Sequence, residues 1–102
     1  MKRLKLRITK EAYNDLKDAR AWYRDKNPLL PKRFNTQVKI TLENLRTLPS
    51  THSIRYQNTR IANIGVFPYA VHYLIEDETI IVLAIHHTAI NPDKWKSRLS
   101  NT

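Results

Sequence analysis

Two adjacent histidines, His86 and His87, are the most conspicuous titratable groups in this chain. A histidine can transfer protons near neutral pH, so either one is a candidate general acid or base. Neighbouring residues of an extended strand point to opposite faces, so the pair cannot hold one metal ion together, and we expect no metal site. The alternative, which we favour, is that one histidine is hydrogen-bonded in the interior and the other lies at the surface.

Arg60 is a further candidate, because a guanidinium group can bind a phosphate through two hydrogen bonds. A lone arginine is equally compatible with a surface ion pair. The rings of Tyr56, Tyr69 and Tyr73 can stack on nucleic-acid bases. Tyr69 and Tyr73 recur on the apolar side of one segment, so we predict that these two belong to the core.

The charge balance is strongly positive, with 18 lysines and arginines against 9 aspartates and glutamates and a net charge of +9. Such an excess attracts polyanions, which include nucleic acid, a nucleoprotein or an acidic protein. The alternative is that the charge serves solubility alone. Cations alternate with apolar residues in the N-terminal segment and cluster again near the C-terminus. Each group could form a binding surface or be solvated charge. They are Arg3, Lys5, Arg7, Lys94, Lys96 and Arg98.

Some kinds of chemistry lack the residues that they need. The chain has no cysteine, which excludes disulfides and thiolate metal sites and is compatible with a reducing cytoplasm. Its single glycine, Gly65, cannot build a glycine-rich phosphate loop, and no serine occupies a nucleophile elbow. No stretch has the pattern of a secretion signal or a membrane span. We therefore expect no cofactor, no membrane partner and a cytoplasmic location.

The segment from Arg60 to His87 must position most of these side chains. Its β-branched and aromatic runs, separated at Gly65 and by an acidic turn at residues 76–78, predict an antiparallel meander. The last run is apolar on both alternating faces, with Ile81, Leu83 and Ile85 on one and Ile80, Val82 and Ala84 on the other. A strand of this kind must be covered on both sides, so we expect it to be central in the sheet.

Two helices are predicted upstream of the meander. The first begins after Thr9, an N-cap residue, and continues to about Lys26, and the second ends before Pro49. The apolar stripes are Ala12, Leu16, Ala19 and Tyr23 in the first helix and Phe34, Val38, Leu42, Leu45 and Leu48 in the second. Because only residues 27–31 link the helices, we predict an antiparallel hairpin packed on one face of the sheet.

The two ends of the chain complete the predicted fold. Leu4, Leu6 and Ile8 alternate with cations, as in a half-buried strand, and Pro92 begins a short helix that carries Trp95. Residues 1–102 are thus predicted to form a single α+β domain. It has an N-terminal strand, an antiparallel helical hairpin, a C-terminal antiparallel β-meander and a short terminal helix.

A characteristic order of residues runs through the chain. It comprises Arg60, the run Phe67-Pro68-Tyr69 with Val71 and Tyr73, the acidic turn, the apolar strand that leads to His86, and Asn91-Pro92 with Trp95 and Arg98. This order resembles the ParE branch of the RelE/ParE toxin superfamily. The resemblance covers nearly the whole chain, because the family also begins with a short strand and a helical hairpin.

The resemblance implies a bacterial toxin of a type II toxin–antitoxin module, often called a plasmid stabilisation protein. Such a toxin inhibits growth until a cognate antitoxin binds it in a hetero-oligomer, and an acidic antitoxin segment would suit a body of charge +9. ParE proteins inhibit DNA gyrase by binding it, so no catalytic residue is expected. RelE relatives instead cut mRNA on the ribosome, and this alternative would use Arg60 with His86 or His87.

The chain lacks most of the basic residues that RelE nucleases have at their active site. The chain keeps Arg60 but has Ala62, Ala70 and Ile90 where those nucleases have basic side chains. Their loss leaves the charge of a phosphorane uncompensated, so we favour gyrase binding over RNA cleavage. Ile90 also stands where ParE proteins often have an arginine, so an inactive member that only binds the antitoxin is a third hypothesis.

Partner contacts are expected from cations and aromatic side chains of the strands and of the C-terminal segment. Such residues combine charge attraction with contact area. The predicted partner-binding residues are Arg3, Lys5, Arg7, Tyr56, Arg60, His87, Trp95 and Arg98.

Overall fold

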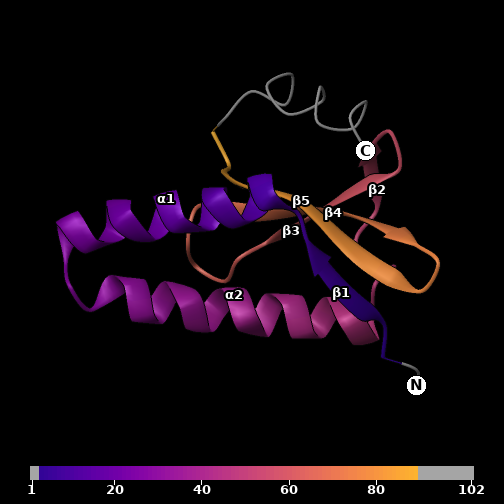
Figure 1. The fold of residues 1–102 in the computed structure, drawn as a ribbon, viewed down its shortest axis with the longest axis horizontal. Coiled ribbons are helices and arrows are strands. Elements are labelled where there is room, and N and C mark those ends of the chain that lie inside the picture. The colour runs from indigo at the N-terminus through magenta and orange to yellow at the C-terminus, as the bar shows by residue number, and fades with distance from the viewer. Residues whose placement is uncertain (1–2, 90–102) are drawn as a thin grey trace.

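The computed structural model describes residues 3–89 of the chain. In this part a helical hairpin packs against a five-stranded sheet (Figure 1), which confirms the predicted α+β fold. The predicted terminal helix with Trp95 lies outside the described residues. Neither of the helices in the described part is long and apolar enough to cross a membrane.

Helix α1 runs from Lys10 to Lys26, as predicted. It begins after Thr9, whose hydroxyl oxygen accepts a hydrogen bond from the amide of Ala12 at 3.1 Å. This contact satisfies one of the amides that have no partner within the first turn of a helix. The predicted stripe is buried at Ala12, Ala19 and Tyr23.

Helix α2 runs from Leu30 to Thr47 and lies antiparallel to α1 (Figure 1). It begins earlier than predicted because Pro31 fits in its first turn, where a residue needs no amide donor. The link between the helices is accordingly only residues 27–29. Leu48 departs from the predicted stripe, because it caps the end of α2 and is 51% exposed.

The strands of the sheet lie in the order β1-β5-β4-β3-β2. Their bounds are Lys5–Ile8 for β1, Ile54–Tyr56 for β2, Thr59–Asn63 for β3, Tyr69–Glu76 for β4 and Thr79–His87 for β5. Strands β2 to β5 pair antiparallel, as the predicted meander requires, whereas β1 pairs in parallel with β5. The sheet is therefore mixed and not wholly antiparallel, because the long connection from β1 through both helices imposes no reversal of direction.

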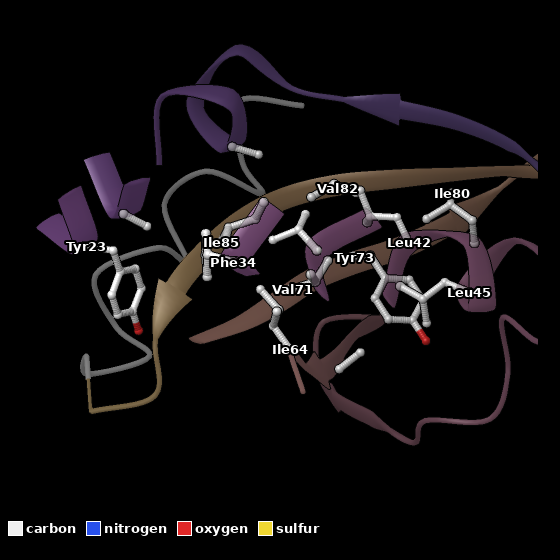
Figure 2. Packing of buried hydrophobic residues seen from close by; sticks show 14 residues of the cluster. Tyr23, Phe34, Leu42, Leu45, Ile64, Val71, Tyr73, Ile80, Val82 and Ile85 are labelled. Carbon is white, nitrogen blue, oxygen red and sulfur yellow. The ribbon is translucent and has the colours of Figure 1, made fainter. Parts of the chain in front are cut away.

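The apolar core fills the space between the helical hairpin and one face of the sheet (Figure 2). Its largest fully buried apolar side chains are Tyr73, Phe34, Leu45, Ile64, Ile80, Ile85, Val71 and Val82. Around Phe34, the rings of Tyr23, Phe67 and Tyr69 pack with centroids 5.1 to 5.9 Å apart. The prediction that Tyr69 and Tyr73 belong to the core is confirmed.

Strand β5 is buried on both faces, as predicted, but the alternation of its side chains between the two faces is interrupted. Its register with β4 shifts between His72 and Tyr73. This β-bulge turns Ile85 toward the helices, where Val82 also lies. The predicted grouping of Ile85 with Leu83 on one face is therefore wrong, because strict alternation does not continue across a bulge.

Candidate functional site

His86 lies near the end of β5. Here β1 no longer pairs with β5, and helix α1 lies beside it instead. Its Nε2 atom is 3.1 Å from a carboxylate oxygen of Asp15 on α1. The same oxygen accepts a hydrogen bond from the amide of Ile85 at 3.1 Å. One carboxylate therefore pairs with the histidine ring and also satisfies a backbone donor of β5 that β1, which ends at Ile8, does not reach.

His86 also belongs to a row of polar side chains that crosses the sheet. Its ring centroid is 6.0 Å from that of His72 on β4. The Nδ1 atom of His72 lies 3.0 Å from the hydroxyl of Tyr56 on β2, and His72 is only 3% exposed. Hydrogen bonding of this kind is what polar groups need in order to be buried, so the row by itself does not imply a substrate.

His87 has different partners from His86. Its ring packs edge-on against Tyr69 with centroids 5.3 Å apart, and its Nδ1 atom accepts a hydrogen bond from the amide of Ala89 at 3.1 Å. Across residues 3–89, no group of three or more histidine, aspartate or glutamate side chains is placed to hold a metal ion. The adjacent histidines thus have different contact partners.

A pocket of about 360 Å³ opens between α1 and the end of β5. It is lined by Asp15, Asp18, Ala19, Trp22, Tyr69, Ile85, His86 and His87. Burial raises the pKa of Tyr69, and the negative charge of Asp18 raises it further. The described lining of this His86 pocket holds two carboxylates and no arginine or lysine. Because a phosphorane accumulates negative charge, this lining is unsuited to stabilising one.

Arg60, the candidate cation of a nuclease site, does not converge with His86. Its Nη1 atom donates a hydrogen bond to the carbonyl of His52 at 2.5 Å. In the sheet, Arg60 lies opposite Tyr73 and His86 lies opposite Ala70. Tyr73 faces the core on the helix side, and Ala70, three positions earlier on β4, faces the other way. Arg60 and His86 are therefore on opposite faces.

Arg60 and Tyr73 together hold the loop that follows α2. The Tyr73 hydroxyl donates a hydrogen bond to the carbonyl of Pro49 at 2.8 Å, beside the contact of Arg60 with His52. Burial raises the pKa of Tyr73, and the positive charge of Arg60 offsets part of this rise. These contacts give Arg60 a structural role that its position in the sequence does not reveal.

The other predicted partner-binding residues do not form one patch within the described residues. Lys5 and Arg7 are exposed on β1, at one edge of the sheet, whereas Tyr56 is on β2, at the other edge. Trp95 and Arg98 lie outside the described residues. The binding roles of these side chains stay predictions.

Arg3 has a partner on α2. Its guanidinium group forms an ion pair with Glu43, and the hydrogen bond from Arg3 is the main cause of the lowered pKa of that carboxyl group. Arg46 is 3.4 Å from the same carboxylate and donates a hydrogen bond to the carbonyl of Leu4 at 2.7 Å. These contacts join the N-terminal segment to the end of α2.

A second hollow, of about 510 Å³, lies between α2 and β3. Its lining residues are Gln37, Ile40, Thr41, Asn44, Leu45, Leu48, Thr51, His52, Ala62, Asn63 and Gly65. No lysine, arginine, aspartate or glutamate is among these described residues, although 26% of the chain is charged. Ile40 is 47% exposed here. We call this hollow the α2 groove, and it shares the lack of charged side chains with the cores of protein interfaces.

The single glycine of the chain borders the α2 groove. Gly65 has a φ of +49°, which side chains other than glycine adopt at a cost. A Cβ atom at this position would lie 2.5 Å from Oε1 of Gln37. Glycine therefore lets the loop approach α2 closely enough to close one side of the groove.

This arrangement of a strand, a helical hairpin and a meander matches a solved structure described as the chromosomal ParDE TA system from P. aeruginosa. The TM-score is 0.74 over 82% of this chain and 95% of that chain, at 15% sequence identity. The likeness defines the class of protein by its fold: a small α+β protein with the architecture found in that toxin–antitoxin system.

The family follows from the sequence match. A family model described as the ParE toxin of the type II toxin–antitoxin system parDE matches residues 6–92, so the chain belongs to the ParE toxin family. The chain is similar to Toxin ParE2 of Mycobacterium tuberculosis, in strains CDC 1551 / Oshkosh and ATCC 25618 / H37Rv. The identity is 26% over 97 residues, which cover 94% of this chain and 92% of that protein. The predicted resemblance is confirmed.

Proposed function

We propose that this ParE-family toxin inhibits growth by binding DNA gyrase in the cytoplasm, and that a cognate antitoxin neutralises it in a toxin–antitoxin complex. Family membership supports the toxin part of the proposal. The observation that favours binding over RNA cleavage is the acidic lining of the His86 pocket, where a nuclease would need cations. No residue is assigned a catalytic role.

The positions of the candidate nuclease residues support the same choice. Arg60 is hydrogen-bonded to the carbonyl of His52, whereas His86 is paired with Asp15 of α1 and lies on the opposite face of the sheet from Arg60. Cleavage of RNA needs a cation and a proton-transfer group beside the same phosphate. A ribosome-dependent mRNA endonuclease is therefore the outcome that we expect the experiments to exclude.

The α2 groove supports a protein partner of the antitoxin type. Protein interfaces are centred on apolar residues and have few charges at their core. Ile40 and Leu48 supply exposed apolar area in a groove whose described lining carries no formal charge. The groove thus offers an antitoxin segment a site to bury apolar side chains, while the net charge of +9 attracts its acidic residues.

The target is tested with purified gyrase and purified toxin. We expect inhibition of DNA supercoiling or accumulation of cleaved DNA–gyrase complexes, with transcripts left intact after induction of the toxin in cells. Primer extension on translated mRNA provides the second readout. Codon-specific cleavage of mRNA together with unimpaired gyrase would replace this proposal with the nuclease alternative.

Neutralisation is tested by expressing the chain alone and then with the protein encoded by the adjacent reading frame. We expect growth arrest in the first case and rescue in the second. Ile40→Asp should abolish rescue without abolishing toxicity, because it puts a charge into the α2 groove, whereas Thr47→Asp on the same helix should not. Absence of growth arrest from the unaltered chain would favour an inactive, antitoxin-binding member.

A further inference from the structure

Cations recur at seven-residue intervals along the exposed side of both helices. They are Lys10, Lys17 and Arg24 on α1, and Lys32 and Lys39 on α2. All five side chains are exposed. Seven residues are nearly two helical turns, so each row follows one side of its helix with about 10 Å between successive cations. We call these five residues the outer face of the hairpin.

The two rows lie on the same side of the hairpin. Residues two positions apart in a helix point about 200° apart. On α1, Asp15 faces β5, so Lys17 lies on the flank nearer to α2. On α2, Gln37 lines the groove beside β3, so Lys39 lies on the flank nearer to α1. The rows therefore run along adjoining flanks of two packed helices.

The cations of the outer face have no ionic partner within residues 3–89. The ion pairs in this part of the chain join Arg3 and Arg46 to Glu43 and join His86 to Asp15. The carboxylates of α1 are Glu11, Asp15, Asp18 and Asp25, and their positions in the sequence place them on its other flank. Helix α1 thus separates its negative charges from its positive row.

The composition of the outer face suits a polyanion better than a protein. Large exposed apolar side chains can anchor a protein interface. Among those of the described residues, Tyr13 is the one beside the outer face. The others are Trp22, Leu29, Ile40, Leu48, Ile54 and Val66. Interfaces with DNA, by contrast, are polar and strongly positive. The uncharged α2 groove and the cationic outer face are accordingly surfaces for different kinds of partner.

We propose that the outer face of the hairpin binds the phosphate backbone of duplex DNA. Packed helices lie about 8–10 Å apart, so the two rows form nearly parallel lines that can follow the phosphate strands on either side of a groove. Single strands are held mainly by successive stacking aromatic rings, whereas Tyr13 is the sole exposed ring beside the described rows. The binding reads charge and shape and not base sequence.

The experiment measures binding of the full-length chain to a fluorescent duplex of arbitrary sequence by anisotropy, at increasing NaCl concentration. The logarithm of the binding constant should fall linearly with the logarithm of the salt concentration, with a slope of about −0.9 per neutralised phosphate. Five contacts give a slope of about −4.5. A salt-independent affinity would contradict the proposal.

Two triple variants with the same change in net charge identify the surface. Lys17→Gln, Arg24→Gln and Lys39→Gln remove three cations of the outer face and should reduce the slope to about −1.8 and weaken binding at low salt by at least about tenfold. Lys26→Gln, Arg33→Gln and Arg55→Gln remove three exposed cations that lie off the outer face and should change little. All the replaced side chains are exposed and glutamine is a good helix former, so both variants should keep the circular dichroism spectrum of the unaltered chain.

Three results would overturn the proposal. Equal losses in the two triple variants would attribute DNA binding to net charge. Tighter binding of a single-stranded RNA, lost in the outer-face variant, would assign the surface to RNA. Tighter binding of polyglutamate, lost in the same variant, would assign it to an acidic protein. If the outer-face triple does not fold, Lys10→Gln with Lys32→Gln gives the same test with an expected slope of about −2.7.

This inference is independent of the proposed target. A chain that inhibits gyrase but does not bind free duplex DNA would lose the inference and keep the proposed function. A chain that binds duplex DNA through the outer face but leaves gyrase active would do the reverse. The gyrase assay therefore tests the proposed function, and the anisotropy assay separately tests DNA binding by the outer face.

Discussion

On the inner side of the helical hairpin, residues that recur at three- and four-residue steps are apolar and buried, as at Ala19 and Val38. On the outer side, residues that recur at seven-residue steps are cationic and exposed, as at Lys17 and Lys39. The inner side holds the fold by removing apolar area from water. The outer side has no described ionic partner within the chain. The same two helices thus separate stability from partner binding, and substitutions can test that separation.

The largest effect is expected from Phe34→Ala on the inner side. Phe34 is fully buried, and its ring packs within 5.4 Å of the rings of Tyr23, Phe67 and Tyr69, centroid to centroid. Its removal leaves a cavity and should lower the free energy of unfolding by about 3–5 kcal/mol, measured by urea titration. Asn35→Ala, at the next and exposed position, is the control. A loss similar to that of the control would break the comparison.

The next effect is expected at alkaline pH, through the buried phenol of Tyr73. Burial raises its pKa above the usual value of 10.0, so the unfolded chain releases this proton at a lower pH than the folded one. The stabilising contribution is therefore complete below about pH 10 and is lost as the pH rises through the folded pKa, by at most about 1.4 kcal/mol per pH unit. Unfolding titrations at pH 8 to 11 measure the slope.

Tyr73→Phe should flatten this alkaline slope, and it also removes the hydrogen bond to Pro49, which contributes about 1 kcal/mol at neutral pH. Tyr13→Phe, at a 52% exposed position, is the matched control and should leave the slope unchanged. Burial also raises the pKa values of Tyr23 and Tyr69, in the same direction. An unchanged slope in Tyr73→Phe would show that these other phenols dominate.

A smaller effect on stability is expected at the start of α1, where Thr9 caps the helix that carries both the inner and the outer side. Thr9→Ala removes the acceptor for the amide of Ala12 and should lower the free energy of unfolding by about 1 kcal/mol. Thr9→Ser should restore most of the loss. Thermal and urea unfolding of the three proteins measure it, and equal stability of all three would remove the capping argument.

The smallest effect on stability is expected on the outer side. Lys17→Gln and Lys39→Gln remove exposed cations that have no described ion pair, so each should change the free energy of unfolding by less than about 0.5 kcal/mol. The same variants should weaken DNA binding. Destabilisation comparable to that of Phe34→Ala would mean that the two sides of the hairpin are not separate.

Most of the fold could be predicted because it follows from local patterns. The spacing of Ala12, Ala19 and Tyr23 identified α1, and Thr9 identified its start. The bulge in β5 could not be predicted, because it arises from pairing with β4 and reverses the expected face of Ile85. Parallel pairing of β1 also depends on contacts between distant parts of the chain.

The candidate site was less predictable for the same reason. His86 was identified as a titratable group, but its partner Asp15 lies on the first helix, and no local signal connects them. Arg60 was a candidate for binding a phosphate or for a surface ion pair, and it donates a hydrogen bond to the backbone carbonyl of His52. The rows of cations become meaningful only when the facing flanks of the helices are known, although the seven-residue spacing is visible in the sequence.

The hydrogen bond from Ile85 to Asp15 has a consequence for association between copies of the chain. Unpaired backbone at a sheet edge is a template for strand addition and a route to aggregation. β1 pairs with β5 as far as Val82, and Asp15 accepts the hydrogen bond of the Ile85 amide farther along the same edge of β5. β1 itself has only four residues and bears Lys5 and Arg7. Crowded copies of the chain are thus discouraged from joining edge to edge on this side of the sheet, even with no second protein covering it.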